Sequence, residues 1–198
     1  MVPVFAVLLA AGVGTTVALG GFDETPYRPG RLGEGSILEQ GQFRTRILGA
    51  RLVVTPPHGR PAVPERILEI DFEVTNLGAR TQRVGSPPGP GPARPAKPSA
   101  AGATFAASVL RITPPLAVTY APQGLVLGDG AESAQLHPGI TGRVVLRYEL
   151  AAEPPARLVL AMGGHEYAAG HGWRPAARPG RTPETLAEVT LPVRREAA

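Results

Sequence analysis

The clearest regularity along the chain is an alternation of apolar and polar residues between positions 66 and 76. The apolar side chains occupy every second position: Leu68, Ile70, Phe72 and Val74. Successive side chains of a strand point to opposite faces of a sheet, so this spacing predicts a half-buried strand with one face toward a core. The residues between them, Glu69, Asp71 and Glu73, are then expected on an exposed face.

Two other segments show the same alternation. Residues 142–150 place Val144, Leu146, Tyr148 and Leu150 on one face, and Val145 on the opposite, outward face. Residues 43–55 begin with the same pattern, which Gly49 interrupts, and a glycine inside a strand typically marks a bulge. Shorter apolar runs at 109–113, 116–120, 125–127, 157–162 and 188–193 complete the set. With Pro/Gly turns between them, seven to nine short strands predict an all-β protein with a β-sandwich fold.

The acidic positions Glu69, Asp71 and Glu73 admit two interpretations. Paired carboxylates in a cleft perform acid–base catalysis when their environments differ, whereas three evenly spaced carboxylates on one strand share a single environment. We therefore expect cross-strand ion pairs rather than catalysis or Ca²⁺ binding. The candidate partners are Arg44, Arg46, Arg143 and Arg147.

Residues 1–22 contain no charged side chain and are mostly apolar. As a helix they would span roughly 33 Å, about the thickness of a bilayer core. The segment is therefore either a transmembrane anchor or a cleaved signal peptide, with small residues at Ala18 and Gly20 before a cut. We favour the anchor. Both interpretations predict that the rest of the chain lies outside the cytoplasm, as a single-pass membrane protein or a secreted one.

Residues 23–35 are rich in Gly and Pro and show no apolar periodicity, which predicts an extended linker. Residues 36–198 then form the β domain. The composition supports this division: 25 Gly and 23 Pro in 198 residues disfavour a helical protein. The absence of Cys excludes disulfides, thiolate metal sites and Cys nucleophiles.

The charge is concentrated in one place. The net charge is +4, and residues 80–103 carry four basic residues, Arg80, Arg83, Arg94 and Lys97, with no acidic one. This Pro-rich segment contains no aromatic residue, which disfavours nucleic-acid binding. It predicts a loop inserted in the sandwich, serving either as a basic contact to anionic phospholipid or cell-wall polymer or as a tolerated insertion with no role.

Few residues suit metal binding or catalysis. His165 and His171, with Glu166 beside the first, lie in a Gly-rich segment that we expect to be a flexible loop, where they are candidate ligands for Cu(II) or Zn(II). The spacing of the two histidines fixes no geometry on a loop, so we expect no bound metal or other cofactor. No serine lies in a nucleophile-elbow motif, and we expect no enzymatic activity.

Three features occur in order along the chain: a strand ending in Thr75-Asn76, the turn Leu136-His137-Pro138-Gly139, and the valine-rich strand at 144–150. In this the chain resembles the uncharacterised immunoglobulin-like domains of bacterial secreted and membrane-anchored proteins, over about residues 40–167. The resemblance implies an immunoglobulin-like sandwich outside the cytoplasm. That family has no agreed activity, so the resemblance assigns no functional residue.

These observations lead to one expected function and one alternative. The first is a non-catalytic binding or accessory domain, anchored by residues 1–22, that contacts a membrane protein or another partner in the cell envelope. The alternative is a metal-handling envelope protein that uses His165 and His171. Neither nucleic acid nor a small-molecule substrate is expected as a partner.

Overall fold

The computed structural model describes residues 29–58, 63–87, 104–127, 132–169, 172–176 and 183–197. Within these ranges the chain is almost entirely β-structure. Its strands are β1 (Gly30–Leu32), β2 (Ile37–Glu39), β3 (Phe43–His58), β4 (Val63–Asn76), β5 (Gln82–Arg83), β6 (Val109–Thr113), β7 (Gln123–Leu127), β8 (Glu132–Ser133), β9 (Gln135–Leu136), β10 (Thr141–Glu149), β11 (Arg157–Gly163), β12 (His165–Ala168), β13 (Gly172–Pro175) and β14 (Thr185–Ala197). One 3₁₀ turn, η1 (Phe105–Ser108), precedes β6. The anchor or signal segment lies outside the described residues.

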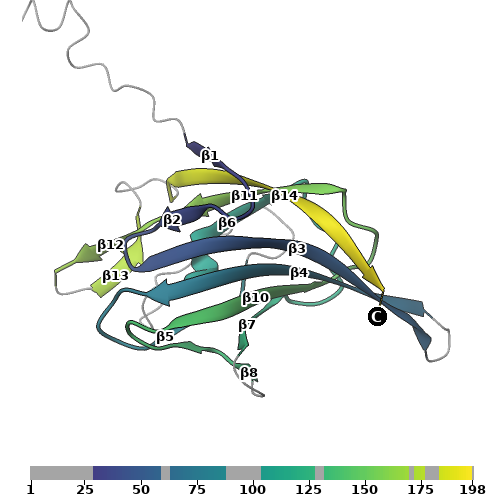
Figure 1. The fold of residues 1–198 in the computed structure, drawn as a ribbon, viewed down its shortest axis with the longest axis horizontal. Coiled ribbons are helices and arrows are strands. Elements are labelled where there is room, and N and C mark those ends of the chain that lie inside the picture. The colour runs from purple at the N-terminus through teal and green to yellow at the C-terminus, as the bar shows by residue number, and fades with distance from the viewer. Residues whose placement is uncertain are drawn as a thin grey trace, which may run out of the picture.

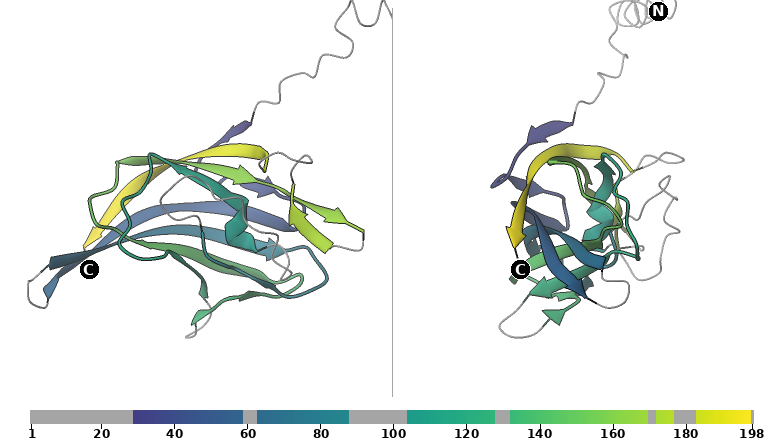
Figure 2. Two further views of the ribbon diagram at one scale, coloured as in Figure 1. Left: turned by 180° about the vertical axis from the view of Figure 1, so that it is seen from behind. Right: turned by 90° about the vertical axis from the view of Figure 1, so that its right-hand side faces the viewer.

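The main sheet folds over on itself to form two layers (Figure 1). Its strand order is β6-β11-β14-β3-β4-β10-β7-β8, with β1 added beside β14 and β2 beside β3. The long strand β14 belongs to both layers. Its first part pairs antiparallel with β11 up to Pro192, and from Val193 it pairs in parallel with β3. The curve of this strand between the layers is visible in Figure 2. The architecture is therefore a β-sandwich, as the alternation predicts.

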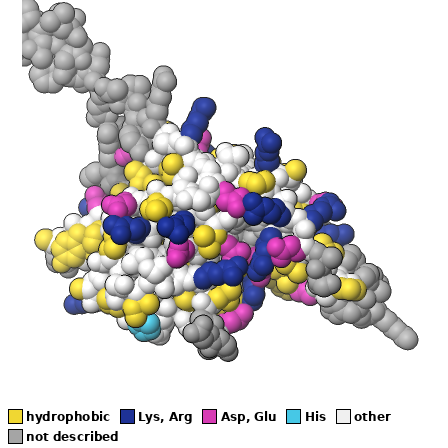
Figure 3. Space-filling model, viewed as in Figure 1, with side chains coloured by type: hydrophobic (Ala, Val, Ile, Leu, Met, Phe, Trp, Pro, Cys, Tyr) yellow, Lys and Arg dark blue, Asp and Glu magenta, His cyan; other side chains and the backbone are white. Residues whose placement is uncertain are grey.

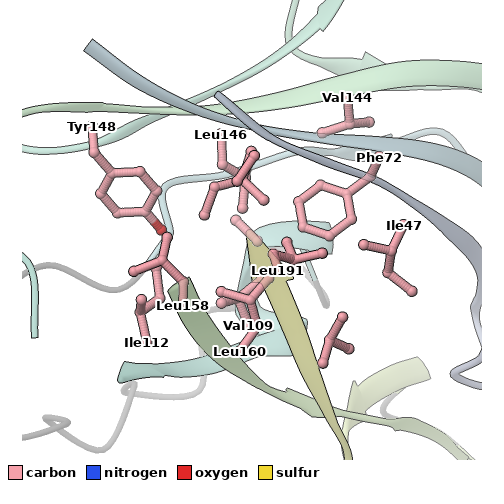
Figure 4. Close-up of a cluster of buried hydrophobic side chains, with 14 of the residues drawn as sticks. Ile47, Phe72, Val109, Ile112, Val144, Leu146, Tyr148, Leu158, Leu160 and Leu191 are labelled. Carbon is pink, nitrogen blue, oxygen red and sulfur yellow. The ribbon is translucent and has the colours of Figure 1, made fainter. Parts of the chain in front are cut away.

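The core lies between the two layers. Figure 4 shows Phe72, Leu146 and Tyr148 from one layer facing Leu158 and Leu160 from the other, and all five side chains are buried. The inward positions predicted on β4 and β10 are confirmed, because Val74, Val144 and Leu150 are buried as well. The fully buried residues of the described core fall between Phe43 and Leu191.

The bulge predicted at Gly49 is present. The pairing of β3 with β4 shifts register between Ile47 and Gly49, and Gly49 has a φ of 148°. A side chain would be strained at this φ, which explains why a glycine interrupts the apolar pattern.

Other sequence expectations need correction. Residues 116–120 form no strand and contribute one isolated bridge, Val118 to Leu150. The linker predicted at 23–35 is not wholly outside the sandwich, because Gly30–Leu32 pairs in parallel with β14. Neither change could be read from alternation, since both depend on a neighbouring strand that is far away in the sequence.

The outer face of β4 also differs from the expectation of an exposed stripe. Glu69 and Asp71 are only 6% and 7% exposed, and Val145, on the same face of the neighbouring β10, is fully buried. β4 is flanked by β3 and β10, whose arginines lie over this face: Arg51 and Arg147 reach Glu69 at 2.6 and 2.7 Å, and Arg143 reaches Asp71 at 2.9 Å. Figure 3 shows the resulting mixture of basic and acidic side chains on this face.

The expected cross-strand ion pairs are thus largely present. Arg46, Arg143 and Arg147 pair with the acidic residues of β4, whereas Arg44 pairs with Glu39 of β2 instead. Burial opposes ionisation of Glu69, but hydrogen bonds from Arg147 and Arg51, and their charges, outweigh it and lower its pKa. The carboxylates of Glu69 and Asp71 are therefore held in a network of ion pairs with arginines from both neighbouring strands.

None of the described residues forms a helix long and apolar enough to cross a membrane.

Candidate binding end of the sandwich

The hairpin of β12 and β13 extends from one end of the sandwich (Figure 1). Its register pairs His165 with Pro175, Glu166 with Arg174, and Tyr167 with Trp173. Residues directly opposite each other share a face, so Tyr167 and Trp173 lie together, with ring centroids 5.7 Å apart in an edge-to-face arrangement. On the other face, Glu166 and Arg174 form an ion pair at 2.8 Å.

Two glycines let the hairpin pack closely against neighbouring loops. A Cβ at Gly41 would collide with the carbonyl oxygen of His165 and lie 3.2 Å from the Trp173 ring, and the φ of Gly41 is 77°. A Cβ at Gly78 would lie 3.4 Å from both the Trp173 Nε1 and the Gln42 Nε2. The indole of Trp173 therefore rests on the backbones of the β2–β3 and β4–β5 loops.

Gln40 connects the hairpin to the β2–β3 loop. Its side-chain amide donates to the carbonyl of Gly163 at 2.7 Å and accepts from the hydroxyl of Thr45 at 2.6 Å. Its backbone carbonyl accepts from the N–H of His165 at 2.7 Å. These buried bonds hold the start of β12 against the sandwich.

Two buried side chains in this region have no hydrogen-bond partner among the described residues. They are Gln42, whose amide oxygen and nitrogen are both unpaired, and His165, whose two ring nitrogens are both unpaired. A buried polar group without a partner costs about 1–3 kcal/mol, so native proteins keep few of them. Burial lowers the pKa of His165 to about 4, and the nearby backbone of Gln40 opposes this only weakly. The ring is neutral at pH 7, and its centroid lies 5.3 Å from that of Phe43 in an edge-to-face arrangement.

Asn76, at the end of β4, organises the adjacent loops. Its side chain donates to the carbonyls of Arg80 and Leu136 at 2.8 and 2.9 Å, and accepts from the N–H of Gly78 at 2.9 Å. Its backbone carbonyl accepts from Gly139 at 2.8 Å. The Thr-Asn strand end and the Leu-His-Pro-Gly turn, far apart in the sequence, are therefore in direct contact.

Several exposed side chains surround these loops. Tyr167 is 67% exposed, and the apolar side chains of Leu77 and Ile140 are also exposed. Arg80 and Arg83 are exposed, and neither forms an ion pair within the described part of the chain. We call this region the aromatic end, defined by Leu77, Arg80, Arg83, Ile140, Tyr167 and Trp173. Figure 3 shows hydrophobic side chains gathered at this end, where the hairpin lies.

The structure changes the picture of the histidine pair. His165 is not on a flexible exposed loop as expected: it begins a strand and is buried. Glu166 is bound to Arg174, and His171 lies outside the described residues. No group of three potential metal ligands occurs in the portion that the structure describes. Of the basic candidates, Arg80 and Arg83 lie at the aromatic end, while Arg94 and Lys97 lie outside the described residues.

Sequence reasoning missed Tyr167 and Trp173. A usable indication was present, since two short runs, HEYA and GWRP, flank a Gly-containing turn in the typical pattern of a hairpin. The unpaired state of Gln42 has no such indication in the sequence, because it depends on three loops packing together.

The fold defines the class of protein, a β-sandwich protein, and the strand pairing itself carries that assignment. No family model and no curated protein matches the chain. Among solved structures, an uncharacterised β-sandwich protein from Clostridium difficile 630 is similar, with 9% identity and a TM-score of 0.44, over 86% of this chain and 97% of that chain.

Proposed function

We propose that the protein is a non-catalytic binding domain of the cell envelope, with an immunoglobulin-like sandwich held outside the cytoplasm by residues 1–22. It contacts its partner, in the membrane or elsewhere in the envelope, through the aromatic end. The observation that carries this proposal is the exposed Tyr167, packed on Trp173 at the same end of the sandwich as the exposed side chains of Leu77 and Ile140. Exposed aromatic and apolar groups gathered at one end of a domain are what a binding surface presents to its partner.

The arrangement supports binding better than catalysis or metal handling. The carboxylates with short contacts, Glu69 and Asp71, are neutralised by arginines, and Glu166 is held by Arg174. The imidazole of His165 is turned against Phe43 in the interior. The metal-handling alternative therefore has no observation in its favour among the described residues.

A site-specific crosslink tests the proposal. A photoreactive amino acid replaces Tyr167 in the full-length protein, expressed in native membranes. The matched control carries it at Tyr120, which is equally exposed at 65% but lies near Leu150, where β10 ends at the opposite end of the sandwich. We expect a discrete adduct from position 167, absent from position 120, and mass spectrometry identifies it as protein, polymer or lipid. Equal labelling from both positions, or none from either, would contradict the proposal.

A further inference from the structure

The position and direction of β1 in the sheet indicate which end of the sandwich lies nearest to the predicted anchor. Gly30, the first residue of β1, pairs with Ala187, which in turn pairs with Met162 near the end of β11. Gly164 and then His165 come directly after β11, so Gly30 lies close to the base of the β12–β13 hairpin. β1 runs parallel to β14, away from that end. The N-terminal end of β1 therefore points toward the aromatic end.

The connection to the predicted anchor is short. Seven residues, 23–29, separate Phe22 from Gly30. Fully extended, they reach about 25 Å at most. The sandwich is longer, because the 16 residues of β3 extend over about 50 Å. A membrane-anchored sandwich thus keeps its aromatic end near the bilayer, while the opposite end, with the end of β14, is directed away.

The chemistry of this end suits a lipid surface. Trp and Tyr are enriched where bilayers meet water, because each combines an apolar ring with a polar group. Leu77 and Ile140 provide apolar contact, and Arg80 and Arg83 provide charge for anionic headgroups. The exposed carboxylate of Glu184 adds one negative charge at this end. The ion pairs Arg44–Glu39 and Arg174–Glu166 add no net charge. Apolar contact therefore supplies most of the interaction, and the arginines add to it.

Tethering makes such a contact effective. A patch of a few side chains binds vesicles weakly by itself, but a short linker raises its effective concentration at the surface to about the millimolar range. We infer that the aromatic end docks on the anionic phospholipid headgroups of the membrane that holds the protein, with Trp173 and Tyr167 at the interface. This inference deepens the proposed function and rests on its anchored form.

The single tryptophan of the chain makes a direct test available. The full-length protein is placed in nanodiscs of phosphatidylcholine and phosphatidylglycerol, with and without brominated acyl chains, which quench tryptophan at short range. We expect quenching and a blue shift of the Trp173 emission. The matched control, W173F/Y120W, carries the tryptophan at the opposite end and is expected to show neither.

Surface variants assign the contact to residues. In a fragment of residues 23–198, which retains the complete described core, L77D is expected to weaken binding to the same vesicles about tenfold. R80Q/R83Q is expected to weaken it by about fivefold for each arginine. The control R111Q/R157Q has the same net charge and changes two exposed arginines without ion pairs among the described residues, outside the aromatic end. It should leave binding unchanged.

The outcomes separate the inference from the proposed function. Alkaline carbonate, which strips proteins that are only peripherally bound from membranes, tests the anchor separately. If the protein resists carbonate but its Trp173 is not quenched, or is quenched no more than in the control, lipid docking is overturned and the anchored binding domain stands. A protein adduct in the crosslinking experiment together with absent quenching does the same and identifies a membrane protein as the partner. If carbonate extracts the protein, the anchor is wrong, and lipid docking is then tested on the fragment of residues 23–198 alone. Binding of this fragment to vesicles with quenching of Trp173 supports docking, and absence of binding overturns it.

Discussion

Acid should destabilise the sandwich through one buried side chain, His165. Its imidazole is buried against Phe43 and neither ring nitrogen has a partner among the described residues, so the protonated form is poorly solvated. Its pKa is lowered to about 4 in the folded protein, against 6.5 for a solvated imidazole. Between these two values the unfolded chain binds a proton that the folded protein does not.

The sign and size of the effect are set by this difference. Because the unfolded state binds more protons in this range, the free energy of unfolding falls as the pH falls from about 6.5 toward 4. The stability is fully present at pH 7.5, begins to fall near pH 6.5, and is lower by about 2.5 kcal/mol at pH 4.5. Glu69 contributes mainly below this window, because its pKa is lowered from its ordinary 4.5.

Urea denaturation followed by circular dichroism, at pH 7.5, 6.0, 5.0 and 4.5, measures this loss in the fragment of residues 23–198. The matched variant is His165→Phe, which keeps a ring at the site and removes both unpaired nitrogens, so it should lose no stability at pH 7.5. We expect the variant to remain nearly level down to pH 5 while the wild type declines. Parallel curves for the two proteins would show that His165 is not buried in neutral form, and the reasoning would fail.

Three further predictions concern the sandwich itself. In urea titrations, Phe72→Ala should reduce the free energy of unfolding by about 3–5 kcal/mol. Glu73→Ala, on the half-exposed outer face, should reduce it by at most about 1 kcal/mol. Equal losses from the two variants would mean that the register of β4 is wrong. Glu69→Gln should reduce the free energy of unfolding by about 2–4 kcal/mol, because it leaves Arg51 and Arg147 without their shared carboxylate. The matched control is Glu73→Gln, and an equally small loss from both variants would refute the buried network. Deleting residues 88–101 and closing the gap with a short Gly-Ser turn should leave the thermal midpoint nearly unchanged, and unfolding of the domain would show that the segment packs against it.

That deletion differs from one chosen by composition alone. The basic, Pro-rich segment begins at residue 80 in the sequence, but Val84 is fully buried in the core and Gly85 has a φ of 78°. A Cβ at Gly85 would lie 2.6 Å from the Thr104 hydroxyl, so the two sides of the insertion are close together. Residues 80–87 therefore belong to the sandwich, and the deletion that leaves it undisturbed has to begin after them.

The aromatic end was beyond the reach of sequence reasoning for a physical reason. Its defining residues come from the β4–β5 segment, the turn between β9 and β10, and the β12–β13 hairpin, which are far apart in the sequence, from Leu77 to Trp173. Asn76 and the turn at Gly139 were each visible as motifs, but only pairing of β4 with β10 brings them into contact. His165 is a similar case. Its Gly-rich sequence context predicts an exposed loop, but contacts with Gln40 and Phe43, more than 100 residues away in the sequence, bury it.

What the sequence alone determined is local. Alternation at 66–76 and 142–150 specified two central strands and their core faces, and Gly49 indicated the bulge, because a strand's period and a glycine's conformational freedom are properties of a few consecutive residues. The tertiary structure alone decided what covers the opposite face. Glu69 and Asp71 are buried because arginines from both neighbouring strands lie over them, and no spacing within one strand encodes which strands will flank it.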